Sequence, residues 1–212
     1  MKLKLPDSGA EVLPDGRRMV KSAARNAEPI LAVLQAQGPA KGRMLEIAAG
    51  SGLHTAVFSS ALPGLIWQPT DVDAGNFGSI KAWAAVSTGQ VLPPVLLDAG
   101  RAGWAAHHAG QDAILLVNLL HLIPAPAAAT VLAEIAAALA PAGVAFVYGP
   151  FLRDGVATSP GDASFDASLR AQDPAIGYKD LGWVLTRLQD AGLRVTVQDM
   201  PANNLMLIAR HA

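Results

Sequence analysis

The sequence has no cysteine, few aromatic residues and few charges, and each scarcity excludes a class of protein. Among its 212 residues cysteine is absent, aromatic residues make up 5% and charged residues 16%. Without cysteine the chain has no disulfide framework, no thiolate metal site and no cysteine nucleophile. Since 51% of the residues are hydrophobic, the composition is instead typical of a folded domain with a sizeable core.

The charge balance and the apolar runs exclude two further classes. Sixteen basic and seventeen acidic residues give a formal net charge of −1 without a basic stripe, so nucleic acid is not an expected partner. Polar residues and prolines interrupt the apolar stretches 113–126 and 127–146 before either could span a membrane. Residues 1–6 lack the apolar core of a signal peptide, and we expect a soluble cytoplasmic protein.

Apolar segments of strand length alternate with helical segments along most of the chain. The expected strands are residues 42–47, 65–70, 91–97, 112–120, 144–148, 194–199 and 205–209. The expected helices are residues 19–37, 53–62, 76–87, 124–139 and 180–191. This alternation predicts an α/β fold with a mostly parallel, seven-stranded, Rossmann-like sheet, an antiparallel C-terminal hairpin and helices on both faces. We expect one domain over residues 19–212, an irregular arm over 1–18 and a functional or mobile loop over 153–162.

Residues 44–54 have the pattern of a buried strand, a glycine loop and the start of a helix. Gly50 and Gly52 allow a ligand to approach the backbone because glycine has no Cβ, and the N-terminus of the helix favours negative charge. The loop lacks the third glycine of a dinucleotide fingerprint and the Gly-Lys-Ser/Thr ending of a phosphate loop. We therefore expect a nucleotide-type ligand of another kind at the carboxyl ends of the strands.

Three carboxylates, Glu46, Asp71 and Asp98, fall at the ends of the first three expected strands. Asp71 can accept two hydrogen bonds from a ribose diol, and Asp98 can accept one from an exocyclic amine such as that of adenine. Together they predict an adenosine site. The alternative is that each carboxylate caps the helix that follows it.

The acidic-x-x-x-Gly-x-Gly pattern resembles the first motif of class I methyltransferases that use S-adenosylmethionine, with Ala48 in place of its first glycine. Further segments extend the likeness. These are Arg25-Asn26 with Glu28-Pro29-Ile30-Leu31, residues 45–54, Trp67 to Asp73, Tyr148 to Phe151 and Met200 to Asn204. Together they resemble the methyltransferase-like 26 family, also known as the DUF938 domain, over roughly residues 17 to 210.

The resemblance implies the class I methyltransferase fold and S-adenosylmethionine as the cofactor. It implies Glu46 near the methionine amine, Asp71 on the ribose hydroxyls and Asp98 on the adenine amine. The remaining expected cofactor contacts are Ala48, Gly50, Gly52, His54, Ala99 and Asn118.

The residues expected to contact a methyl acceptor come from several elements: Arg25, Asn26, His121, Tyr148, Asn203 and Asn204. We expect His121, at the exit of the fourth strand, to serve as a general base and Tyr148 to orient the acceptor. Structural alternatives stay open: a helix cap for Asn26, a hydrogen bond at a helix start for His121, core packing for Tyr148 and turn chemistry for the asparagines.

The sequence thus predicts methyl transfer to a small molecule by in-line displacement, a reaction that requires no metal. No clustered spacing of metal ligands is present. One alternative is a nucleotide-dependent oxidoreductase of NAD type, which the missing third glycine disfavours. The other is a non-catalytic protein that keeps the fold and binds the cofactor. The oligomeric state is open, a homodimer included.

Overall fold

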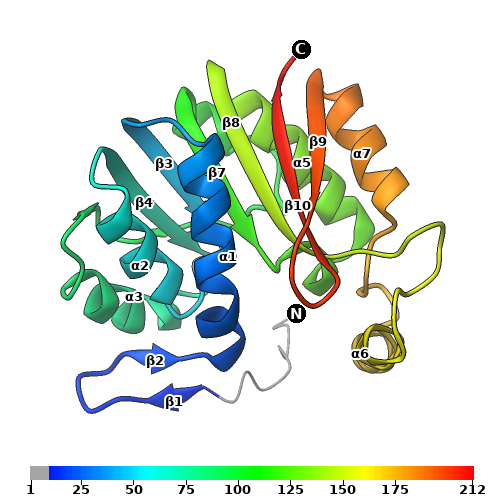
Figure 1. The fold of residues 1–212 in the computed structure, drawn as a ribbon, viewed down its shortest axis with the longest axis horizontal. Coiled ribbons are helices and arrows are strands. Elements are labelled where there is room, and N and C mark those ends of the chain that lie inside the picture. Colours follow the sequence, from blue (N-terminus) through cyan, green and yellow to red (C-terminus); the bar gives the residue numbers. More distant parts are fainter. Residues whose placement is uncertain (1–9) are drawn as a thin grey trace. The chain divides into compact units, whose positions relative to one another are not determined.

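The structure is a computed structural model that describes residues 10–212. The chain forms two compact units, Met1–Asp98 and Ala99–Ala212, which are described in turn (Figure 1). As predicted, the fold is α/β, with mostly parallel strands, an antiparallel C-terminal pair and helices around them. The single domain over residues 19–212 stays a prediction.

The first unit consists of parallel strands joined through helices, preceded by a short hairpin. Its elements are β1 (Glu11–Val12), β2 (Arg18–Met19), α1 (Lys21–Gln37), β3 (Gly42–Ile47), α2 (Leu53–Ala61), β4 (Leu65–Asp71), η1 (Ala74–Asn76), α3 (Phe77–Ala84), β5 (Gln90–Val91) and β6 (Val95–Leu96). Strand β4 pairs in parallel with β3 on one side and with β5 and β6 on the other. Phe58 and Trp67 are fully buried between these elements, as expected where helices cover a parallel sheet.

The first unit departs from the sequence-based expectation in two places. The expected strand 91–97 is broken into β5 and β6, because Pro93 and Pro94 lie between them and have no N–H to donate to a ladder. The arm over residues 1–18 was expected to be irregular, but β1 and β2 form an antiparallel hairpin that turns at Gly16 (φ 85°). Residues 1–9 lie outside the described part of the chain.

The second unit contains the remaining strands. Its elements are α4 (Ala105–His108), β7 (Gln111–Val117), η2 (Leu120–Leu122), α5 (Ala125–Ala138), β8 (Leu139–Pro150), α6 (Pro160–Gln172), α7 (Leu181–Asp190), β9 (Leu193–Asp199) and β10 (Asn204–His211). Strand β8 pairs in parallel with β7, and β10 runs antiparallel to both β8 and β9. The predicted C-terminal hairpin is therefore confirmed.

A tight turn joins β9 to β10. Ala202 (φ 57°) and Asn203 (φ 60°) are both left-handed, and the Asn204 N–H donates to the Pro201 carbonyl at 3.4 Å. Two successive positive φ values are typical of the primed turns whose twist matches that of a hairpin. This geometry explains why an asparagine occurs here.

Helix α6 was not predicted, because its sequence is rich in Gly, Ser and Asp. Its start nevertheless has the usual signals: the Ser159 hydroxyl accepts a hydrogen bond from the Asp162 N–H at 3.1 Å, and Pro160 occupies the first turn. The expected loop over 153–162 is thus shorter, ending where α6 begins. In Figure 1 α6 is seen end-on, apart from β8, β9 and β10. Across residues 10–212, the structure contains no helix of the length and hydrophobicity that a membrane crossing requires.

Candidate functional site

The loop between β3 and α2 has the backbone conformation of a ligand-binding turn. Ala48, Gly50 and Gly52 have φ values of 56°, 58° and 87°, all in the left-handed region. A Cβ at Gly52 would lie 2.6 Å from the Ile80 Cα, so packing against α3 already requires glycine there. At Gly50 the nearest atom to such a Cβ is the Ala48 carbonyl oxygen at 3.9 Å. Gly50 is therefore the position at which a ligand can approach the backbone.

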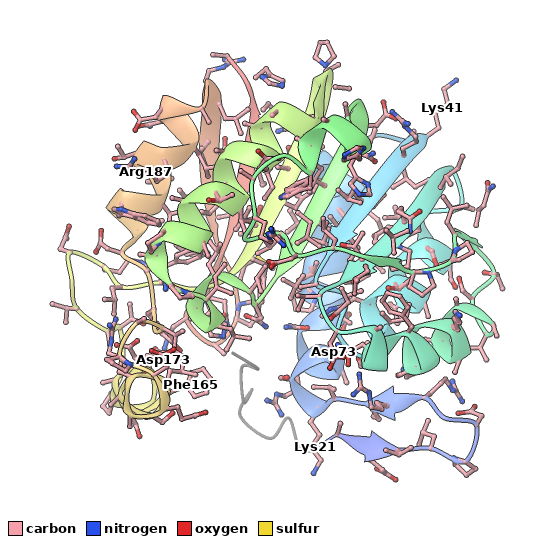
Figure 2. The ribbon with its side chains drawn as sticks, turned by 180° about the vertical axis from the view of Figure 1, so that it is seen from behind. Lys21, Lys41, Asp73, Phe165, Asp173 and Arg187 are labelled. Carbon is pink, nitrogen blue, oxygen red and sulfur yellow. The ribbon has the colours of Figure 1, made fainter. Side chains whose placement is uncertain are left out.

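Asp71, at the end of β4, holds this loop in place through a hydrogen bond to Gly50. Its Oδ2 accepts the Gly50 N–H at 2.8 Å and its Oδ1 accepts the Asp73 N–H at 2.9 Å, and its side chain is buried. Each carboxylate oxygen can accept a further hydrogen bond. Asp73, labelled in Figure 2, instead caps η1 by accepting the Gly75 N–H at 2.9 Å. The two acids thus have different roles, and Asp71 keeps the acceptor capacity that a ribose diol needs.

Glu46 is buried beneath the loop. Its Oε2 accepts the Thr55 hydroxyl at 2.5 Å and the Trp67 Nε1–H at 2.6 Å. Burial, opposed by these two hydrogen bonds, raises the pKa of Glu46 to about 7. Glu46 thereby connects β3 to α2 and β4, while its predicted contact with the methionine amine stays a prediction.

His54 and Asn26, expected at the cofactor and at the acceptor, contact each other. The His54 Nε2 lies 2.8 Å from the Asn26 Oδ1 and 3.2 Å from the Ala23 carbonyl oxygen. Both neighbours are acceptors, so the neutral ring carries its proton on Nε2. Burial lowers the pKa of His54 to about 4, and its ring stacks on Phe58. Asn26 lies inside α1, so the alternative that it caps a helix is wrong.

Two candidate residues of the first unit remain, Arg25 and Asp98. Arg25 is exposed on α1, and Asp98 is exposed just beyond β6. In the second unit Ala99 is buried, and its carbonyl oxygen accepts the Trp104 Nε1–H at 3.1 Å.

In the second unit the chain turns sharply after β7. Asn118 follows the strand with φ 58°, and its N–H donates to the Tyr148 carbonyl oxygen at 2.9 Å. Asparagine tolerates this conformation better than most residues. The Tyr148 side chain is buried in β8, only 3% exposed. The backbone thus joins two of the predicted residues.

His121 lies in η2 among aromatic rings. Its ring is edge-on to Phe165 and Tyr178, with centroids 5.9 and 5.8 Å away. Phe165, labelled in Figure 2, comes from α6. The N-cap residue of α5, Pro124, makes no side-chain cap, and the alternative of a hydrogen bond from His121 at that helix start stays open.

Lys179 lies beside this histidine and was not predicted from the sequence. Its Nζ donates to the Ile123 and Gly177 carbonyl oxygens, both at 2.8 Å, while the Gly177 N–H donates to the His121 carbonyl oxygen. Burial, together with the charge of Lys179, lowers the pKa of His121 to about 4. His121 is therefore neutral at physiological pH.

The two asparagines of the β9–β10 turn have separate partners. Asn203 donates from Nδ2 to the Asp162 Oδ2 on α6 at 3.0 Å. Asn204 donates to the Pro201 and Ala202 carbonyl oxygens, both at 3.1 Å, within its own turn. Turn chemistry therefore accounts for Asn204, whereas Asn203 connects the hairpin to α6.

Sequence reasoning also missed Arg18, which lies at the glycine loop. Its Nη2 donates to the Gly50 carbonyl oxygen at 3.4 Å and to the Asn76 Oδ1. No motif includes this residue, because it comes from a hairpin 32 residues before the loop.

Solved structures share the fold of this chain. An O-methyltransferase family protein from Burkholderia thailandensis is 20% identical with a TM-score of 0.76, and the match covers 90% of this chain and 57% of that one. The mitomycin 7-O-methyltransferase MmcR is 17% identical with a TM-score of 0.75, covering 92% and 55% of the two chains. Human N-acetylserotonin methyltransferase, solved in complex with SAM, is 16% identical with a TM-score of 0.70, covering 91% and 53%.

This chain spans a little over half the length of these proteins. At such identities the likeness establishes the fold. A family assignment comes from the sequence itself, because residues 17–211 match the family described as "Protein of unknown function (DUF938)". The chain therefore belongs to the DUF938 family.

Proposed function

We propose that this protein is a methyltransferase that transfers a methyl group from S-adenosylmethionine to a small molecule. The observation that carries the proposal is the loop of residues 48–52, open above Gly50 and fastened to the carboxylate of Asp71. The structural neighbours support it, since their names describe methyltransferases, two of them O-methyltransferases, and one was solved with SAM. Assignment to the methyltransferase-like 26 family is part of this proposal.

The described residues fit the cofactor at three points. The open space above Gly50 admits the ligand, and the two Asp71 oxygens keep acceptor capacity for the ribose hydroxyls. Helix α2 begins at Leu53 with no acidic residue in its first turn. The Leu53 N–H donates to the Ser51 hydroxyl at 3.4 Å, and the next N–H groups of the first turn are left for a ligand. Asp98 and Ala99 would bind the adenine, and Glu46, Ala48, Gly52, His54 and Asn118 would complete the cofactor site.

The bound cofactor would supply an activated methyl group on a sulfonium. Its methyl carbon would accept a lone pair of the acceptor, and its sulfur would keep the electron pair of the broken sulfur–carbon bond. The protein mainly aligns the reacting atoms. An alcohol or amine acceptor also loses a proton, which neutral His121 would take. Arg25, Asn26, Tyr148 and Asn203 would orient the acceptor, and Asn204 would hold the turn that presents Asn203.

The proposal is tested by titration calorimetry with S-adenosylmethionine and S-adenosylhomocysteine. We expect the Asp71→Asn variant to bind about 10- to 100-fold more weakly, because a ribose diol hydrogen-bonds more strongly to a carboxylate than to an amide. Asp73→Asn is the matched control, since Asp73 caps η1. NAD is titrated alongside. No binding of either sulfur compound at millimolar concentration, with NAD retained, would overturn the proposal in favour of an oxidoreductase.

After binding is established, a metabolite screen for methyl acceptance identifies the acceptor. His121→Ala would then slow transfer to an alcohol or amine. Unchanged turnover of this variant across the pH range would refute the role of His121 as a base.

A further inference from the structure

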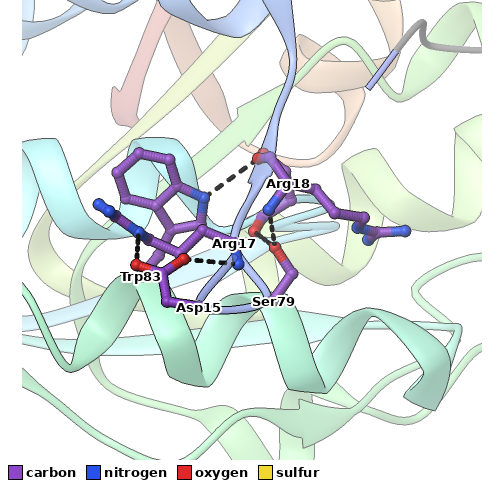
Figure 3. A network of polar contacts seen from close by, with 6 residues as sticks. Asp15, Arg17, Arg18, Ser79 and Trp83 are labelled. Atoms are coloured by element: carbon purple, nitrogen blue, oxygen red, sulfur yellow. Dashed lines mark hydrogen bonds and ion pairs between the residues drawn. The ribbon is translucent and has the colours of Figure 1, made fainter. Parts of the chain in front are cut away.

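The N-terminal hairpin places the guanidinium of Arg18 beside the glycine loop. Both backbone polar groups of Arg18 are bonded to α3: its N–H donates to the Ser79 hydroxyl at 2.9 Å and its carbonyl oxygen accepts the Trp83 Nε1–H at 3.1 Å (Figure 3). Ser79 in turn donates to the Ser51 carbonyl oxygen at 2.6 Å. The hairpin is thus held by its backbone, and the Arg18 side chain is not needed to attach it.

Among residues 10–212, the hydrogen-bond partners of the Arg18 guanidinium are neutral. Its Nη2 donates to the Gly50 carbonyl oxygen and the Asn76 Oδ1, and its Nε is buried without an acceptor. No carboxylate within residues 10–212 forms an ion pair with it. A partly buried cation with an unused donor is costly unless an anion accepts from it. The site therefore favours an anionic ligand.

The neighbouring arginine has a different environment. Arg17 forms an ion pair with Asp15 at 2.8 Å and lies over the Trp83 ring, 4.7 Å from its centroid. In Figure 3 the two guanidiniums point in opposite directions, Arg17 toward Trp83 and Arg18 away from it. Of these two arginines, Arg18 is therefore the one that bonds to the glycine loop.

Gly50 is hydrogen-bonded to both Arg18 and Asp71. Its N–H donates to Asp71 and its carbonyl oxygen accepts from Arg18, so groups of opposite charge flank one residue. The proposed cofactor has matching ends, a ribose diol that needs an acceptor and an aminoacyl carboxylate that needs a donor. We infer that Arg18 binds the carboxylate of the aminoacyl end of S-adenosylmethionine, a step that rests on the proposed function.

The test compares two ligands that differ in the aminoacyl group. S-adenosylhomocysteine carries the carboxylate, and 5′-methylthioadenosine has the same nucleoside and thioether without it. We expect Arg18→Gln to weaken S-adenosylhomocysteine binding by about 10- to 100-fold, the usual loss for a charge-assisted hydrogen bond. Binding of 5′-methylthioadenosine should change less than threefold, and Arg18→Lys should recover part of the lost affinity.

Arg17→Gln is the matched control, since it removes the same charge from the same hairpin. It should leave the affinity ratio of the two ligands unchanged. An equal loss for both ligands in Arg18→Gln would mean that the side chain only shapes the loop, and no loss would mean that it is not used; either result overturns the inference. Failure of the wild-type protein to bind either ligand would instead refute the proposed function.

Discussion

Among individual residues, Glu46 makes the structure around the glycine loop depend on the protonation of its own carboxyl group. Its carboxyl group is fully enclosed, and two donors from α2 and β4 meet the same oxygen. The pKa of Glu46 is about 7 in the folded chain, against an ordinary value of 4.5. This carboxyl group is therefore neutral in mild acid. The local structure should therefore respond to pH even without ligand.

The sign of this effect follows from proton linkage. Between pH 4.5 and 7 the unfolded chain loses the Glu46 proton while the folded chain keeps it, so the free energy of unfolding falls as pH rises. We expect Glu46→Gln, which cannot ionise, to gain stability relative to wild type from pH 4.5 to pH 8, by at most about 3 kcal/mol. Urea denaturation at several pH values measures this difference. A gap that stays constant with pH would contradict the buried carboxyl.

Ala48 shows how much one residue could be predicted. The motif placed it in a glycine loop, and its left-handed φ of 56° agrees with the glycine expected at this position. Asp71 was likewise predicted from its place at a strand end. In contrast, the bond between His54 and Asn26 joins residues 28 apart on different helices, and no spacing rule indicates it. Side-chain pairs of this kind depend on packing, which periodicity does not specify.

Among the elements, α6 is held to the second unit by polar contacts from Asp162, Asp166 and Arg170. The Tyr178 N–H donates to the Asp166 Oδ1 at 2.6 Å, and the Arg170 Nη2 donates to the Tyr178 carbonyl oxygen at 3.2 Å. Asp162 accepts hydrogen bonds from Ser159 within its own helix start, from Asn203 of the hairpin and from the Tyr178 hydroxyl at 3.3 Å. Below it, Leu169 packs with Tyr178 in a small apolar cluster. Because most residues of α6 are exposed, this helix should open locally before the unit unfolds.

We expect Asn203→Gly to speed amide hydrogen exchange across residues 160–172 by about twofold to tenfold, because it removes the bond to Asp162. Glycine suits the left-handed φ at this position, so the turn itself is kept. Asn204→Ala is the control, since Asn204 bonds only within the turn. Equal exchange in α6 for wild type and both variants would show that Asn203 does not hold the helix.

The order of strands and helices could be predicted because β3, β4, β7, β8 and β10 each contain a run of apolar residues. Helix α6 could not, since its Ser-, Gly- and Asp-rich sequence matches both loops and capped helices, and tertiary contacts decide between them. Pro93 and Pro94 indicate the break between β5 and β6, because neither proline has an N–H to donate to the ladder.

For the whole molecule, acid should be destabilising on balance, because two buried histidines oppose and outnumber the one buried carboxyl group of Glu46. His54 in the first unit and His121 in the second have pKa values lowered to about 4 by burial, against an ordinary 6.5. As pH falls from 6.5 to 4 the unfolded imidazoles take up protons and the folded ones do not, so the free energy of unfolding decreases.

Thermal unfolding between pH 4 and 7 measures this loss. We expect His121→Phe, which keeps an aromatic ring beside Tyr178, to lose less stability in acid than wild type by about 1–3 kcal/mol. His107→Gln changes an exposed imidazole and serves as the control. Identical acid profiles for wild type and His121→Phe would show that His121 is not shielded from protons.

The position of β9 bears on how the protein behaves at high concentration. This strand lies at the end of the sheet order, and apart from Leu193 and Val195 its residues are exposed, Val197 among them. An edge strand offers backbone donors and acceptors to other chains, which is a route to aggregation. Arg194 and Asp199 place charges at either end of β9, and such charges are how natural sheets discourage edge-to-edge pairing. Solubility of this chain should thus depend on the charges of Arg194 and Asp199 at the two ends of β9.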